Sequence, residues 1–281
     1  MSNPRSLHAG TILSAGPEGL SPQDLVRAAV ANEVAAANDT SAKHIFRARK
    51  QTPQGSQTRL YVETREAMAG ITIAYNDKPL TPDQQKGEID RLGGLLASPE
   101  QLQRKHAQEQ DNAERTLRIV KALPDAFLYQ LDGEEIGTPG MSRAGVRLIR
   151  LKFRPDPGYQ PPSHVEQMLE GMQGVILIDP VAKRIAKIDG TLFKEVSFGW
   201  GILGHLDKGG HFEVEQADLG DGSWGIAHMS LRFNGKILLF KSISINSDEV
   251  FSDFRRVPAE TTFAQGVEML KAELATLAQN K

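Results

Sequence analysis

Hydrophobic residues recur at helical spacing near both ends of the chain. Ser21 and Pro22 form a helix start signal ahead of an apolar stripe that runs to Val34. At the other end, apolar residues spaced by three and four positions from Phe263 to Leu277 predict a C-terminal amphipathic helix. The chain is therefore expected to begin and end its ordered part with helices.

A third helical region lies within residues 81–122. Two start signals, TPDQ at 81–84 and SPEQ at 98–101, both have the pattern of a capping box with proline at the first helical position. Residues 101–115 are mostly polar, which predicts that the second helix is amphipathic and partly solvated. We interpret residues 81–122 as a helical hairpin inserted between strands.

The rest of the chain reads as short runs of alternating or apolar residues separated by turn signals, among them Asp132-Gly133, Asp189-Gly190 and Asn234-Gly235. Connections this short favour an antiparallel meander, since parallel strands need long crossovers. The sequence therefore predicts an α+β fold: a large curved antiparallel sheet, a half-barrel of about eleven strands, with covering helices and the inserted hairpin. The predicted strands are 44–51, 57–66, 69–75, 127–131, 146–153, 174–179, 184–189, 192–198, 211–216, 224–233 and 237–245.

Composition narrows the function classes. The 281 residues carry a formal net charge of −2, which argues against nucleic-acid binding by excess positive charge. The chain contains 0 cysteines, so disulfides and thiolate chemistry are excluded, and no run approaches the roughly 18 apolar residues of a transmembrane segment. Residues 1–20 are rich in Gly, Ser and Pro and predict a flexible N-terminal tail. We expect residues 21–281 to form a single domain.

Candidate chemistry is sparse. His211, Glu213 and Glu215 share one face of a predicted strand and His228 lies nearby in sequence, which could form a metal or acid–base site. The alternative is the polar, solvated face of an alternating strand. Motifs for serine hydrolases, zinc proteases, P-loops and EF-hands are absent from the sequence. We therefore expect no catalytic residue, no metal and no cofactor.

Two further motifs supply candidate ligand contacts. FGWGILG at 198–204 contains G-x-G-x-x-G, but a strand rather than a helix is predicted after it, which favours a glycine-rich loop over a nucleotide site. Trp200 either fills the core or stands in an apolar ligand site. In VFSDFRR at 250–256, Asp253 and its neighbouring arginines form either a buried ion pair or strap, or leave Arg255 facing a ligand. Phe198, Trp200 and Arg255 are the ligand-binding candidates.

Three segments resemble a known group of proteins. GVILIDP at 174–180, with KRI at 183–185 after it, is similar to a strand–turn–strand of the periplasmic lipoprotein carriers (LolA-like proteins) and their outer-membrane lipoprotein-sorting relatives. The segments at 198–204 and 250–256 resemble more closely an uncharacterised bacterial family of that broad type. The likeness extends from about Pro22 to Leu270. It implies a half-barrel covered by helices, an apolar cavity for acyl chains, and export to the periplasm.

These observations favour a non-enzymatic binding or carrier protein whose partner is a hydrophobic ligand: a lipid, an acyl chain or a lipoprotein segment. Two alternatives stay open, a small-molecule enzyme that uses the His/Glu cluster and a packed structural or interaction protein. The resemblance implies the periplasm, although residues 1–5 lack the apolar core of a signal peptide, which leaves the cytoplasm as the alternative.

Overall fold

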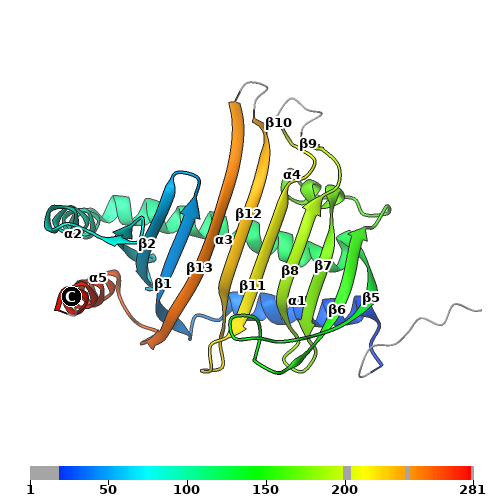
Figure 1. The fold of residues 1–281 in the computed structure, drawn as a ribbon, viewed down its shortest axis with the longest axis horizontal. Helices are drawn as coiled ribbons and strands as arrows, with labels where there is room; N and C mark the ends of the chain where they lie inside the picture. The colour runs from blue at the N-terminus through cyan, green and yellow to red at the C-terminus, as the bar shows by residue number, and fades with distance from the viewer. Residues whose placement is uncertain (1–18, 199–203, 238–240, 280–281) are drawn as a thin grey trace, which may run out of the picture.

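The computed structural model describes residues 19–198, 204–237 and 241–279. One antiparallel sheet crosses the whole molecule (Figure 1). Eleven strands follow one another in the order β4-β3-β2-β1-β13-β12-β11-β8-β7-β6-β5, and the β9–β10 pair joins at β12. The strands are β1 (Lys43–Thr52), β2 (Gly55–Val62), β3 (Ala69–Tyr75), β4 (Lys78–Pro79), β5 (Phe127–Ile136), β6 (Arg147–Pro155), β7 (Met172–Asp179), β8 (Arg184–Leu192), β9 (Val196–Phe198), β10 (Gly204–Leu206), β11 (His211–Asp218), β12 (Trp224–Ile237) and β13 (Lys241–Val257).

The sheet consists of two meanders that meet in its middle. β1 to β4 run outward to one edge, and β5 to β12 run inward from the other edge. β13 then pairs with both β12 and β1, so the last strand of the chain lies beside the first. All strand pairings are antiparallel and the sheet is open, so the α+β class and the sheet of about eleven strands in order are confirmed.

Five helices and one 3-10 turn accompany the sheet in the described part of the chain. Their N-termini follow from local sequence: Ser21, Thr81, Ser98 and Ser163 each accept a backbone N–H in the first turn of the helix that follows. Thr81 forms the full capping box with Gln84, whereas Ser98 caps without the reciprocal bond that the pattern predicts. The elements are α1 (Pro22–Asn38), α2 (Pro82–Ala97), α3 (Pro99–Ala126), α4 (His164–Gln167), η1 (Met168–Gly171) and α5 (Phe263–Gln279).

The helices give the sheet two distinct faces. We call the face that carries α1 and α3 the inner face; both helices lie behind the sheet in Figure 1. There Val26 of α1 and Leu123 of α3 belong to one buried cluster with Leu151 and Ile176 of the strands. The opposite, outer face is covered at β1–β3 by α5 in a second cluster of buried apolar residues. The described helices lack the combination of length and apolar composition that a membrane crossing requires.

Strand register extends the inner face from β7 to β2. Ile176 pairs with Ile188, Ile188 with Val214, and Val214 with Met229, so these four side chains share one face. Phe251 lies on the same face, because it is two residues beyond Glu249, the partner of Met229 on β13. Ala48, opposite Phe251, and Arg59, opposite Ala48, continue the row onto β1 and β2.

Three predicted turns are wrong, and each lies inside a strand. β8 runs through Asp189-Gly190, β12 through Asn234-Gly235, and β5 through Asp132-Gly133 with a bulge. Two of these glycines allow a close approach instead of a turn. A Cβ on Gly190 would lie 2.4 Å from the Phe212 ring, and one on Gly235 would lie 2.2 Å from the His205 carbonyl oxygen. The predicted tail falls mostly on residues 1–18, outside the described part.

Candidate ligand-binding site

The middle of α3 has no buried side. Residues 110–116, about two helical turns, are all exposed. We call this segment the free span. Before it, the carboxylate of Glu109 accepts the backbone N–H of Met68, and after it Leu123 belongs to the buried cluster of the inner face. In the view of Figure 1 the helix passes behind β13, β12 and β11. α3 is therefore attached near its two ends and crosses the inner face without packing the free span onto it.

The strands of the inner face keep large apolar side chains partly open to solvent. Phe212 pairs with Leu231 and Val214 with Met229, so these four form one patch on β11 and β12. Ile245 of β13, opposite Phe233, is 42% exposed. A fully packed core would bury such residues, as it does on β6 and β7. The partly or fully exposed members of this inner apolar surface are Phe212, Val214, Met229, Leu231, Ile243, Ile245, Phe251 and Phe254.

Aromatic rings continue this surface toward β2. Phe46 stacks on Tyr61 with ring centroids 5.4 Å apart and on Phe254 at 5.2 Å. Phe251 lies 6.2 Å from the same ring. Contacts of this kind add to the stabilisation that apolar burial supplies. These rings therefore form an aromatic cluster on β13, β1 and β2. On β13 it is followed by Glu249 and Ser247, which lie opposite Met229 and Leu231 of β12.

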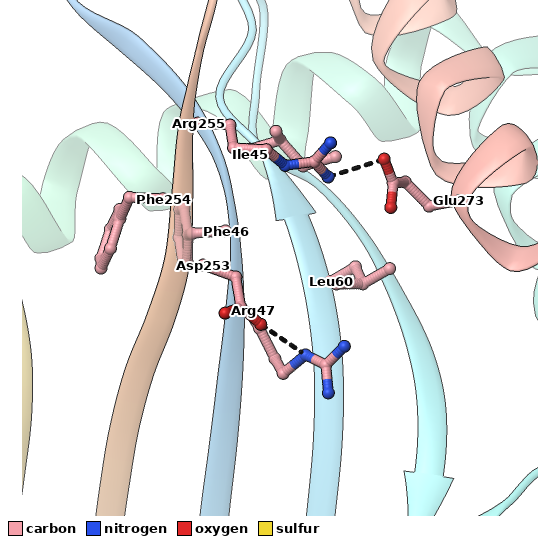
Figure 2. A pocket seen from close by; sticks show the side chains of 8 residues that line it. All are labelled: Ile45, Phe46, Arg47, Leu60, Asp253, Phe254, Arg255 and Glu273. Carbon is pink, nitrogen blue, oxygen red and sulfur yellow. Dashed lines mark hydrogen bonds and ion pairs between the residues drawn. The ribbon is translucent and has the colours of Figure 1, made fainter. Parts of the chain in front are cut away.

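Arg255, one of the predicted ligand contacts, lies on the outer face instead. It lines a pocket of about 370 Å³ between α5 and strands β1, β2 and β13, and it pairs with Glu273 of α5 at 2.6 Å (Figure 2). Asp253 pairs with Arg47 at 3.1 Å in the same pocket. Of the alternatives left open for residues 250–256, Asp253 and Arg255 do not pair with each other but form two partly exposed ion pairs with other elements. A β-bulge explains this, since Asp253 adopts φ 57° and with Phe254 faces one residue of β1.

The other two predicted contacts, Phe198 and Trp200, are only partly described. Phe198 ends β9, where its backbone pairs with Gly204 of β10. Trp200 and residues 199–203 of the glycine-rich motif lie outside the described residues. The structure therefore does not bring the three candidates together in one described site, and their role in ligand binding stays a prediction.

The His/Glu cluster is assembled on the outer face, with a lysine in its centre. His228 Nδ1, from the neighbouring strand β12, lies 3.3 Å from Glu213. Lys187 Nζ lies 2.9 Å from Glu213 and 3.0 Å from Glu215. Burial lowers the pKa of Lys187, but its bonds to the two glutamates outweigh this and raise the pKa above the ordinary value. The two carboxylates thus already bind an ammonium group. His211 pairs instead with Asp189, at 3.0 Å.

A second histidine network was not expected from the sequence. Buried His44 lies 2.9 Å from Asp221, 3.2 Å from the Ser223 hydroxyl and 3.4 Å from Glu63. The arrangement resembles a serine–histidine–acid triad, but the serine hydroxyl donates to Asp221 at 2.5 Å. That bond, more than the contact with His44, holds the pKa of Asp221 well below its ordinary range against the opposing effect of burial. The network joins the β11–β12 turn to β1.

Comparisons with known proteins give a weak structural similarity to two solved structures. No protein-family model matches the chain, and no curated protein matches it. Among solved structures, a domain from Vibrio parahaemolyticus assigned to outer-membrane lipoprotein sorting aligns over 87% of this chain and 97% of that one, with 11% identity and a TM-score of 0.31. A DUF1329 family protein from Desulfovibrio piger aligns over 84% and 93%, with 9% identity and a TM-score of 0.27.

Proposed function

We propose that this chain is a non-enzymatic binding or carrier protein that holds a lipid, an acyl chain or an acylated lipoprotein segment against its inner face, beneath α3. The observation that carries the proposal is the exposed free span of α3, together with the partly exposed apolar side chains on the inner face of β11, β12 and β13. A hydrocarbon chain would remove those side chains from water and would itself be removed from water.

The free energy expected from burying a long acyl chain is sufficient for micromolar binding. Burying one methylene group contributes about 0.8 kcal/mol, so a chain of about twelve methylenes could gain roughly 10 kcal/mol. Micromolar binding requires about 8 kcal/mol, and the ordering of the ligand and side chains takes up part of the gain. A long acyl chain therefore fits this surface energetically, whereas a short one does not.

The alternatives receive less support. An enzyme built on Glu213, Glu215 and His228 would need their carboxylates available, but both glutamates bind Lys187. A fully packed interaction protein would not leave Ile245 and its neighbours open on the inner face. Periplasmic localisation forms part of the carrier proposal and is supported by the resemblance of the sequence motifs alone.

Native mass spectrometry of the purified protein, followed by organic extraction, tests the proposal directly. We expect a co-purifying lipid, or micromolar binding of a fluorescent fatty acid by the delipidated protein. A protein that co-purifies with no lipid and does not bind the fatty acid would overturn the proposal.

A matched pair of variants on β13 locates the binding face. Ile245 is 42% exposed on the inner face, and Val250 is 45% exposed on the outer face. Ile245→Asp is expected to weaken fatty-acid binding at least tenfold, because it places a charge on the apolar surface. Val250→Asp is expected to leave binding unchanged. Equal effects of the two variants would argue against the inner face as the site.

A further inference from the structure

A basic pocket lies at one end of the inner apolar surface. It has a volume of about 230 Å³ and is enclosed by β2 and β3 on one side and by α2 and α3 on the other. Its α3 residues directly precede the free span. The lining residues are Arg59, Tyr61, Met68, Gly70, Arg91, Leu95, Lys105, Glu109 and Phe263.

Two of the three cations in this lining already have carboxylate partners. Arg91 pairs with Glu88 at 3.0 Å, and Lys105 pairs with Glu109 one turn further along α3. Arg59 has no carboxylate partner, because within the described residues no carboxylate lies within ion-pair distance of its guanidinium group. The pocket therefore contains one cation whose charge is not balanced by the protein around it.

Arg59 is also poorly satisfied in its hydrogen bonds. Its Nε is buried and has no partner among the described residues, and one Nη donates to the carbonyl of Gly70 at a long 3.4 Å. The guanidinium lies over the Tyr61 ring, 5.0 Å from its centroid. Arg59 as a whole is half-buried, but a guanidinium with a buried, unpartnered Nε and no anion beside it is incompletely satisfied, so this geometry favours an anionic ligand.

The backbone at Gly70 leaves room for this arrangement. A Cβ at this position would lie 2.6 Å from the Tyr61 ring and 3.4 Å from an Nη of Arg59. Only glycine lets the ring and the guanidinium lie flat on β3. Gly70 thus allows the Arg59 guanidinium and the Tyr61 ring to approach the β3 backbone.

The pocket is connected to the apolar surface through Tyr61. This ring lines the pocket and stacks on Phe46, which in turn stacks on Phe254. A molecule with its charged end at Arg59 can therefore place its apolar part against the rings of Tyr61, Phe46 and Phe254.

We propose that this pocket binds the anionic headgroup, a carboxylate or phosphate, of an amphiphile whose hydrocarbon chain lies on the inner face, with Arg59 as the ion-pairing residue. This inference rests on the proposed function and specifies its ligand class. The guanidinium presents several N–H donors in a plane, which suits two oxygens of one carboxylate or phosphate.

Calorimetric titration of the delipidated protein with laurate, dodecyl phosphate and dodecanol tests the inference, because the three share one chain length and differ in headgroup. We expect the two anions to bind at least tenfold tighter than the alcohol. Arg59→Gln should remove that difference and leave dodecanol binding unchanged. Arg47→Gln is the matched control, because Arg47 lies on the neighbouring strand in the outer-face pocket and should keep the difference.

The outcomes separate the two proposals. Equal affinity of the wild-type protein for laurate and dodecanol would overturn the headgroup inference and leave the carrier proposal standing. Failure of all three ligands to bind would overturn both. Acetate or inorganic phosphate binding as tightly as laurate would identify a free-anion site and overturn the inference. Urea unfolding of Arg59→Gln checks that it folds, and Arg59→Lys, which keeps the charge, should retain part of the preference for anions.

Discussion

The ion pair between Glu33 and Arg184 fixes α1 to the inner face and offers a stringent test of the fold. Two parallel bonds of 2.9 Å join the carboxylate to the guanidinium, and Glu33 also accepts the backbone N–H of Ile185 at 2.9 Å. Both side chains are 11% exposed. Trp224 lies 5.3 Å beneath the guanidinium. We predict that Glu33→Gln destabilises the protein strongly, because Arg184 then stays buried without its counterion.

The size of the loss in unfolding free energy follows from the burial of the Glu33–Arg184 pair. Breaking a buried pair by removing one partner costs about 3–5 kcal/mol. Glutamine keeps one oxygen that can still accept from Ile185, so we expect the lower end, about 3 kcal/mol. For a chain of 281 residues unfolding as one unit, this corresponds to a fall in Tm of about 5 °C. An exposed helical pair such as Glu100 with Arg104 contributes only about 0.3–0.5 kcal/mol, which makes Glu100→Gln the matched control.

Urea unfolding followed by tryptophan fluorescence and by circular dichroism measures both variants. Trp224 reports directly on the region around Arg184. Replacing both partners, Glu33→Gln with Arg184→Met, should recover part of the loss, since no uncompensated charge then remains. A loss for Glu33→Gln no larger than that for Glu100→Gln would refute the assignment of this pair as a buried anchor.

Three further predictions address other elements. Amide hydrogen exchange should be faster in residues 110–116 than in the final turns of α3, and a bound fatty acid should slow it; uniform protection would contradict the free span. Gly190→Ala should cost about 1–3 kcal/mol in urea unfolding, because its Cβ would meet the Phe212 ring at 2.4 Å. Ser223→Ala removes the bond that lowers the pKa of Asp221, so it should cost about 1.5 kcal/mol at pH 7. The loss of stability in Ser223→Ala should shrink as the pH falls below 3.8, the ordinary pKa of an aspartate, because a lowered pKa stabilises the folded protein only when the carboxylate is ionised in the unfolded chain. A loss that does not change with pH would disprove the link between Ser223 and the pKa of Asp221.

Elements fixed by local chemistry could be predicted from the sequence. The capping box at Thr81 and the cap at Ser98 set the starts of α2 and α3, and the apolar spacing from Phe263 predicted α5. The Asp-Gly and Asn-Gly turn signals failed because glycine has a second use that local sequence does not reveal. At Gly190 and Gly235 the missing side chain makes room for a group from another strand.

The candidate site could not be predicted, because it depends on which distant strands become neighbours. β1 and β13 are separated by most of the chain, and their pairing places Phe46 beside Phe254. Arg59 cannot be distinguished as a site residue from sequence alone, because an arginine at an alternating position of a strand is typical of a solvated face. Its unusual feature, a charge without a partner, exists only once β2, β3 and the α2–α3 hairpin have come together.

The polarity of α3 explains why the inner face stays open. A helix that closed a core would repeat apolar residues every three or four positions along its whole length. α3 does this only after Leu117, and along the free span every position is exposed. Its middle is therefore held by helix hydrogen bonds and by pairs such as Asp111 with Arg115, rather than by burial. The absence of an apolar stripe at this point accompanies the partial exposure of the apolar side chains on the inner face of β11, β12 and β13.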